Sequence, residues 1–244
     1  MRPPIGYKKA GRRKRACLYP TPFARRLGDT MRTNPFYDTW LFILGSTDDH
    51  QKLGALAYFF VALFLALILA SAWIVWRNWR EDPAQRNGRD VTTCVCRVLI
   101  GCMWFQGCLW KLPLPISGGF QYWTGEMAEN AAFAFHRALV TDVYLPYLAF
   151  IQPIVFLAEI SFATSLILGF GVRLFALLAV FFSLHLWLGL YRHPAEWPWN
   201  YVFLAVVLAL FVAYAAGRSL GADALLRRHA KQGTLAGRFA ALAS

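Results

Sequence analysis

The chain has 244 residues and a mass of 27.7 kDa, of which 58% are hydrophobic, 16% aromatic and only 16% charged. Soluble domains carry about 25% charged residues, so this composition, with a mean hydropathy of +0.41, excludes an ordinary soluble domain, a disordered chain and a collagen-like repeat. The formal charge of +12 is informative mainly through the places where the basic residues lie. We therefore expect an all-α integral membrane protein.

Five apolar stretches predict membrane-spanning helices, because a bilayer core of about 30 Å needs about 20 apolar residues of helix. They lie at about 53–76, 91–112, 142–173, 173–192 and 197–217. The stretches are continuous rather than alternating, which favours helices over a β-barrel. The turn at residues 169–171 is tight, so we expect the two helices that it joins to be antiparallel neighbours.

The last four spans are expected to form a compact four-helix transmembrane bundle, and the first span is expected to be an appended helix. The predicted divisions, in chain order, are a basic tail with an aromatic segment at 1–52, the appended helix at 53–76, a polar hinge at 77–92, the bundle at 93–218 with its outer loop at 112–146, and a basic tail at 219–244. No internal repeat is visible.

Basic residues predict the orientation, because Lys and Arg near span ends favour the cytoplasmic side. One side of the predicted spans carries four of them: Lys52, Lys111, Arg137 and Arg192. The other side carries ten: Arg77, Arg80, Arg86, Arg89, Arg173, Arg218, Arg227, Arg228, Lys231 and Arg238. We therefore expect a multi-pass protein of a bacterial-type inner membrane with a cytoplasmic C-terminus, although counting the ten Lys and Arg of residues 1–32 would reverse this balance.

The basic tail at residues 1–32 leaves two interpretations open. It is either an upstream extension of a protein whose translation starts at Met31, or an electrostatic arm for anionic lipid or an acidic partner. A twin-arginine export signal is disfavoured, because no clean apolar region follows the arginines. The aromatic stretch at residues 34–45 is too short to span a bilayer and predicts an interfacial or partner-binding segment.

Metal and haem sites are not expected. The cysteines are Cys17, Cys94, Cys96, Cys102 and Cys108, an odd number that we interpret as small apolar packing residues. No CxxC pair, HExxH motif, P-loop or dinucleotide fingerprint is present. One deep intramembrane histidine, His185, is too few for a bis-histidine haem, and the ligands of a zinc or iron site do not assemble. Nothing in the sequence indicates a nucleic-acid partner.

The second predicted span carries a stripe of candidate residues at helical spacing. Its members are Arg97, Gly101, Trp104, Cys108 and Lys111. In the functional interpretation, Arg97 and Lys111 position anionic or carbonyl groups of a bound quinone, with Gly101, Trp104 and the flanking Gln106 beside it. In the structural interpretation, Gly101 serves helix packing and the two cations extend to the two membrane surfaces.

Glu159 and His185 are the remaining intramembrane candidates, because ionisable groups in a bilayer are costly. With a rise of about 1.5 Å per residue, they lie roughly 14 Å and roughly 18–20 Å above the turn at 169–171. We expect them to face each other near the midplane, with Gln106 at a similar level. Such a pair can pass protons or bind a quinone carbonyl, and is therefore the predicted catalytic pair; an interhelical hydrogen bond is the structural alternative for His185.

The outer loop at 112–146 is rich in aromatic and acidic residues. Its second half, about 126–140, predicts a short amphipathic helix lying on the bundle. Its candidate members are the aromatic and acidic residues and one histidine: Phe120, Tyr122, Trp123, Glu126, Glu129, Phe133, Phe135 and His136. Aromatic residues form a belt at the same level: Trp187, Tyr191, Trp197, Trp199 and Tyr201. Anchoring at the membrane surface is the ordinary interpretation, and a lidded mouth for a quinone head group is the sharper one.

The pattern Arg97-x3-Gly101-x5-Gly107-x3-Lys111 at the start of a four-span bundle resembles the DoxX family. The likeness continues through the outer loop, Pro153, Glu159 and the turn at 169–173, over about residues 93–218. That family includes the small DoxD-type membrane subunit of thiosulfate:quinone oxidoreductase. The resemblance implies a membrane subunit coupled to a quinone-reducing complex, while the first span and the basic tail depart from the family's four-span pattern.

Two functions follow as expectations. The first is a quinone-linked oxidoreductase subunit of a respiratory complex, oxidising thiosulfate or another small reductant on the outer side. The second is a non-catalytic structural subunit, which binds a larger respiratory or photosynthetic complex through the first span, residues 34–45 and the basic tail. Both imply other membrane protein subunits as partners. A small-solute carrier is disfavoured, because the sequence shows neither an inverted repeat nor broken spans.

Overall fold

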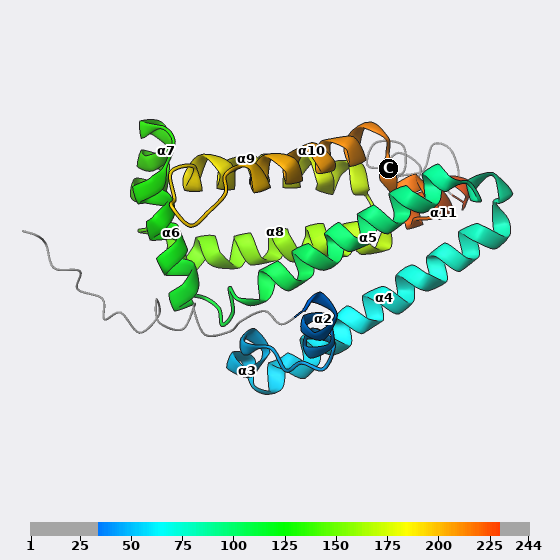
Figure 1. The fold of residues 1–244 in the computed structure, drawn as a ribbon, viewed down its shortest axis with the longest axis horizontal. Coiled ribbons are helices and arrows are strands. Elements are labelled where there is room, and N and C mark those ends of the chain that lie inside the picture. The colour runs from blue at the N-terminus through cyan, green and yellow to red at the C-terminus, as the bar shows by residue number, and fades with distance from the viewer. Residues whose placement is uncertain (1–33, 230–244) are drawn as a thin grey trace, which may run out of the picture. The chain divides into compact units, whose positions relative to one another are not determined.

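The computed structural model describes residues 34–229, and every regular element in this range is helical. In chain order the elements are α2 (Pro35–Ile43), α3 (Asp48–Leu53), α4 (Ala55–Glu81), η1 (Pro83–Gln85), α5 (Gly88–Leu109), α6 (Gly118–Asn130), α7 (Ala134–Leu139), η2 (Val140–Tyr144), α8 (Leu148–Leu168), α9 (Val172–Leu190), α10 (Trp199–Ala213), η3 (Ala216–Arg218) and α11 (Ala222–His229) (Figure 1). The predicted all-α fold is therefore confirmed for this part of the chain.

The predictions made for the two tails lie outside the described residues. They concern residues 1–32, including Cys17 and Met31, and residues 230–244 with their two basic side chains. Residues 34–40 belong to a unit separate from the one that begins at Leu41. In that first unit the backbone N–H of Tyr37 donates to Asn34 Oδ1 at 2.7 Å, which caps the start of α2.

Four helices are long and apolar enough to cross a membrane: residues 56–81 of α4, and α5, α8 and α9. They indicate a multi-pass membrane protein. The fifth predicted span, 197–217, is not confirmed, because its helix α10 has only 15 residues. At about 1.5 Å per residue, α10 covers roughly 22 Å, which is less than a bilayer core of about 30 Å.

Helix α8 lies between α5 and α9, and α10 packs along α9 (Figure 1). The turn between α8 and α9 has Gly169 at φ 70° and Gly171 at φ 61°. Glycine occupies this left-handed region without the steric penalty of a Cβ, so α8 ends and α9 begins within three residues. The predicted antiparallel contact between these two helices is confirmed.

Helix α4, which the sequence predicts as an appended first span, packs against α8 of the bundle. Its buried residues recur at alternating spacings of three and four: Ala57, Phe60, Phe64, Leu67, Ser71, Ile74 and Asn78. The ring of Phe60 meets Phe156 of α8 edge-on at 6.1 Å between centroids. The hydroxyl of Ser71 donates to the carbonyl of Ile167 at 2.7 Å. Both contacts fix α4 along α8.

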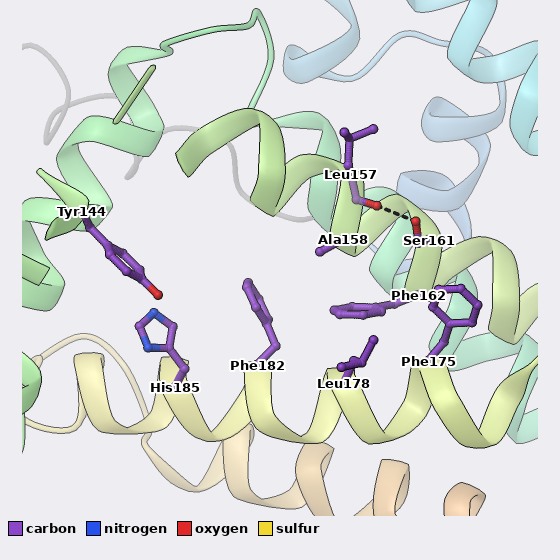
Figure 2. A pocket seen from close by; sticks show the side chains of 9 residues that line it. All are labelled: Tyr144, Leu157, Ala158, Ser161, Phe162, Phe175, Leu178, Phe182 and His185. Atoms are coloured by element: carbon purple, nitrogen blue, oxygen red, sulfur yellow. Dashed lines mark hydrogen bonds between the residues drawn. The ribbon is translucent and has the colours of Figure 1, made fainter. Parts of the chain in front are cut away.

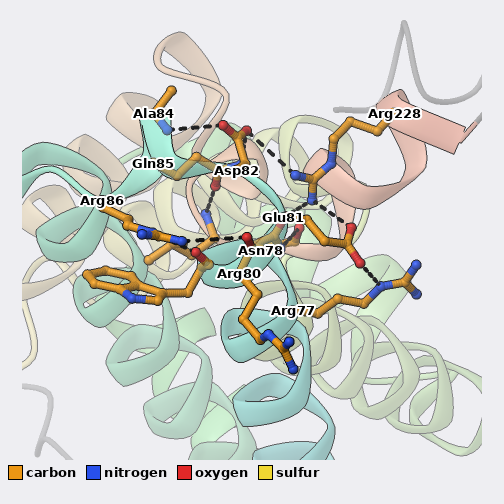
Figure 3. A network of polar contacts seen from close by, with 12 residues as sticks. Arg77, Asn78, Arg80, Glu81, Asp82, Ala84, Gln85, Arg86 and Arg228 are labelled. Atoms are coloured by element: carbon orange, nitrogen blue, oxygen red, sulfur yellow. Dashed lines mark hydrogen bonds and ion pairs between the residues drawn. The ribbon is translucent and has the colours of Figure 1, made fainter.

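The predicted polar hinge at 77–92 is part of a network that joins the end of α4 to α11 (Figure 3). Arg77 Nε lies 2.6 Å from Glu81 Oε1, and the guanidinium of Arg228 on α11 lies 3.8 Å from Glu81 and 3.6 Å from Asp82. The guanidinium of Arg228 also donates to Asn78 Oδ1. These contacts hold the connection between α4 and α5 against α11.

The predicted outer loop at 112–146 folds into α6, α7 and the π-helical turn η2, which together cover one end of the bundle (Figure 1). In place of the one helix predicted at about 126–140 there are two, because α6 begins at Gly118 and ends at Asn130 and α7 covers Ala134–Leu139. Ser117 sets this start, since its hydroxyl accepts a hydrogen bond from the backbone N–H of Phe120 at 3.2 Å. A small apolar cluster under this cap contains Met127, Ala128, Val140 and Leu190.

Candidate functional site

The predicted stripe on α5 forms one buried face. Arg97, Gly101, Trp104, Cys108 and Lys111 are all buried. Gln106 differs, because its side chain is exposed on another face of the helix. It therefore flanks the buried stripe without belonging to it, and its predicted level near that of Glu159 and His185 stays a prediction.

Arg97 is fully buried and contacts the last carbonyls of α8. Its Nη1 donates to the carbonyl of Leu166 and, at 3.3 Å, to the carbonyl of Ile167. The final carbonyls of a helix lack helical partners and carry the negative end of its dipole, so a cation there is stabilising. Its Nη2 lies 3.6 Å from Cys94 Sγ. These contacts favour the structural interpretation of Arg97 over the predicted ligand-positioning role.

Asp223, a residue that sequence reasoning missed, caps the helix on the other side of the same turn. Its carboxylate accepts hydrogen bonds from the backbone N–H groups of Gly171 at 2.7 Å and Val172 at 3.2 Å. Burial raises the pKa of Asp223, and these two hydrogen bonds partly oppose that rise. The available signal was an isolated acid inside a basic, glycine-containing segment that follows the last span.

At Gly101, α5 approaches α8 closely. A Cβ at this position would lie 2.8 Å from the Ile167 side chain and 2.9 Å from its backbone nitrogen. Trp104, one turn further along, packs edge-on against Phe162 at 5.4 Å and Phe182 at 5.8 Å. Both predicted ligand-binding residues therefore serve packing between helices.

Glu159 pairs with Lys111 rather than with His185. Lys111 Nζ lies 2.6 Å from Glu159 Oε2, and both side chains are almost fully buried. The ammonium also donates to the carbonyl of Gly107 at 3.1 Å and lies 4.1 Å from the centre of the Trp110 ring. The ion pair compensates two charges that would each be costly alone in a buried position.

His185 hydrogen-bonds to His136 of α7, which differs from the predicted Glu159–His185 arrangement. The His185 Nδ1 to His136 Nε2 distance is 3.0 Å. His136 is 2% exposed, and burial lowers its pKa, which keeps the imidazole neutral near pH 7. In the sequence His136 was only one member of the outer loop, because nothing local indicates a partner 49 residues away.

A groove of about 530 Å³ runs between α8 and α9 (Figure 2). Its lining residues are Tyr144, Leu157, Ala158, Ser161, Phe162, Phe175, Leu178, Phe182 and His185. This volume is within the range of about 300–1,000 Å³ that is typical of small-molecule sites. Leu157 and Leu178 are largely exposed, so the groove opens on a surface of the bundle that faces lipid if these helices span a membrane.

The polar groups of the groove gather at one end. Figure 2 shows the hydroxyl of Tyr144 pointing toward the imidazole of His185, and the two ring centroids are 5.2 Å apart. Further along the groove, the hydroxyl of Ser161 donates a hydrogen bond to the carbonyl of Leu157 at 2.6 Å. The groove is therefore apolar along most of its length, with an imidazole and a phenol at its end.

Within residues 34–229, no group of three His, Cys, Asp or Glu side chains is placed to hold a metal ion. The four cysteines of this range are free thiols, two of them buried. The expected absence of metal and haem stays a prediction.

No family model, curated protein or solved structure matches the chain. The resemblance to the DoxX family therefore rests on the residues quoted for it above and stays a prediction. What the geometry itself offers is the groove between α8 and α9.

Proposed function

We propose that this protein is a membrane subunit of a quinone-linked respiratory redox complex, and that quinone binds in the groove between α8 and α9. The observation that carries the proposal is the groove's amphipathic lining, with His185 and Tyr144 at one end of an otherwise apolar channel. A quinone likewise has a polar end and an apolar part, since its flat head group with two carbonyls is joined to an apolar chain.

The groove's lining supports this assignment by contact chemistry. Phe162, Phe175 and Phe182 give flat apolar surfaces for an isoprenoid chain. Imidazole N–H and phenol O–H groups donate hydrogen bonds to carbonyl oxygens. Because exposed leucines border the groove, a ligand dissolved in the bilayer reaches it sideways without crossing water.

The proposal assigns quinone contacts to His185 and leaves Glu159 a structural role. Ala158 lines the groove, whereas the neighbouring Glu159 contacts Lys111 at the end of α5. From the sequence we further propose five spans with a cytoplasmic C-terminus. A partner of the thiosulfate:quinone oxidoreductase type, with its own redox group, would supply the electrons.

The test is to measure quinone that co-purifies with the protein from its native membrane in mild detergent. We expect quinone in the wild type and about three- to ten-fold less in His185→Leu, because the quinone carbonyl then loses a hydrogen bond. Phe181→Leu is the matched control on the same helix, since Phe181 is exposed and outside the groove lining. Wild-type protein without quinone would reject the proposal.

A non-catalytic structural subunit is the second candidate. It is favoured because the candidate residues make contacts within the chain itself. Arg97 caps α8, Gly101 permits helix contact, and Lys111 neutralises Glu159. Deleting residues 1–40, a unit separate from the rest, would then release the chain from its partner subunits. Retained partners together with bound quinone would favour the first candidate.

A further inference from the structure

The His136–His185 pair links the groove to the cap of the bundle, which consists of α6, α7 and η2. Two neutral imidazoles whose nitrogens are 3.0 Å apart share a single hydrogen, because each neutral ring has one N–H and one lone pair. Only two arrangements are therefore possible. Either His136 donates from Nε2, or His185 donates from Nδ1.

Each arrangement gives the groove a different chemistry. If His136 donates, His185 Nδ1 accepts, and His185 carries its own hydrogen on Nε2 as a donor. If His185 donates, its Nε2 presents a lone pair instead. Since Nδ1 of His185 is engaged by His136, Nε2 is the ring nitrogen left to interact with a ligand in the groove that this side chain lines.

The surroundings of His136 favour the first arrangement. Its Nδ1 is buried and has no partner in the described part of the chain. If His185 donated, His136 Nδ1 would have to carry a hydrogen and would become an orphaned N–H group. Orphaned buried N–H groups are rarer in proteins than under-satisfied acceptors, so the hydrogen belongs on Nε2 of His136, between the two rings.

We propose that His136 fixes His185 as a hydrogen-bond donor, which makes the groove prefer ligands with a strong acceptor oxygen, such as a quinone carbonyl, over the corresponding hydroxyl compound, whose oxygen is a weaker acceptor. This inference rests on the proposed function of the groove. The hydroxyl of Tyr144, at the same end (Figure 2), supplies a second donor. His136 is a positioning residue, since it acts on the ligand through His185.

The first experiment reads the tautomers directly in unaltered protein. The chain has five histidines, so ¹⁵N labelling of histidine rings and NMR in lipid nanodiscs gives a small set of signals, assigned by single substitutions. We expect a protonated Nε2 and an unprotonated Nδ1 on His185. A protonated Nδ1 on His185 would overturn the inference whatever the ligand is.

The second experiment compares a short-chain prenylated benzoquinone with its hydroquinone, the latter measured anaerobically with reductant. We expect the wild type in nanodiscs to bind the quinone about three- to ten-fold more tightly, the factor that one neutral hydrogen bond contributes. His136→Leu should lose this preference, because His185 is then free to adopt either tautomer. His136→Gln should restore it, because an amide N–H can again donate to His185 Nδ1.

The outcomes separate this inference from the function on which it rests. Equal binding of the two compounds, or tighter binding of the hydroquinone, would overturn the inference and leave a quinone site standing. Binding of neither compound by the wild type would reject the proposed function and the inference together. A preference for quinone that is lost in His136→Leu and regained in His136→Gln would establish the positioning role.

Discussion

The ion pair between Lys111 and Glu159 joins the end of α5 to α8 through an Nζ–Oε2 contact of 2.6 Å. Both side chains are buried, so each charge depends on the other for compensation. Removing one partner of a buried pair leaves an uncompensated charge, whereas replacing both by apolar residues is often close to neutral. The pair therefore sets the relative position of two helices.

We expect Lys111→Met to destabilise the protein by about 3–5 kcal/mol, because it leaves the buried Glu159 carboxylate without a compensating charge. Lys111→Met combined with Glu159→Leu should recover most of that loss. Thermal unfolding in detergent, analysed as a double-mutant cycle, measures the coupling. Additive effects of the two substitutions would show that the side chains do not interact.

His136 makes stability depend on pH. Burial lowers its pKa below the ordinary value of about 6.5. A histidine whose pKa is lowered on folding stabilises the folded state above the unfolded pKa, and that contribution is lost as the pH falls. We expect the unfolding temperature to drop below about pH 6.5, and to drop less in His136→Gln. Parallel curves for the two proteins would contradict this; the neighbouring Glu126–His193 pair is present in both.

At the scale of elements, the contact between α5 and α8 depends on a residue without a side chain. Gly101 and Gly107 lie on the same helix, but a Cβ would lie 2.8 Å from Ile167 at the first position and would meet nothing within 4 Å at the second. The two positions therefore separate the effect of helix contact from the effect of helix propensity.

We predict that Gly101→Ala destabilises the protein by about 1–3 kcal/mol, the range for overpacked interiors. Gly107→Ala should be neutral or stabilising by up to about 1 kcal/mol, because alanine favours helix. Unfolding temperatures of the two variants in the same detergent provide the comparison. Equal effects would mean that α5 and α8 are not in close contact.

Local patterns in the sequence predicted part of this arrangement. Helical periodicity alone placed Arg97, Trp104 and Lys111 on one face of a helix, and the two glycines near residue 170 predicted a tight turn. The pairing of His185 with His136 was not predictable, because it depends on how the cap folds back over the bundle. Depth along a helix gave the level of Glu159 but not the direction of its side chain, which turns toward α5.

Contacts between α4 and α8 were also missed, although a signal for them exists. Ser71 and Asn78 lie on the same three- and four-residue spacing as the buried phenylalanines of α4. Polar side chains on such a seam indicate a helix partner in a membrane. The capping role of Asp223 depends on the return of the chain after α10, so its local signal, an isolated acid in a basic segment, did not indicate which helix it caps.

At the scale of the whole molecule, basic and aromatic residues mark the end of α4 that precedes α5. The guanidinium of Arg77 lies 5.5 Å from the Trp73 ring, and that of Arg80 lies 4.9 Å from the Trp76 ring. Tryptophan beside arginine is typical of a membrane interface, and arginine favours its cytoplasmic side. α11 contacts the same end of α4.

This arrangement predicts a cytoplasmic C-terminus. A fluorescent protein fused to the C-terminus should fluoresce, because it folds in the cytoplasm. Alkaline phosphatase fused at the same place should be inactive, since it needs an oxidising compartment for its disulfides. Active alkaline phosphatase would reverse the orientation.

The most direct test of the central claim is photolabelling with a quinone analogue that carries a photoreactive group on its ring, in nanodiscs containing the wild-type protein. We predict that mass spectrometry will find the label on α9 near His185 and Phe182 and on the cap near Tyr144, and that excess unlabelled quinone will prevent it. Labelling spread over the outer faces of the helices, unaffected by excess quinone, would contradict a quinone site in this groove.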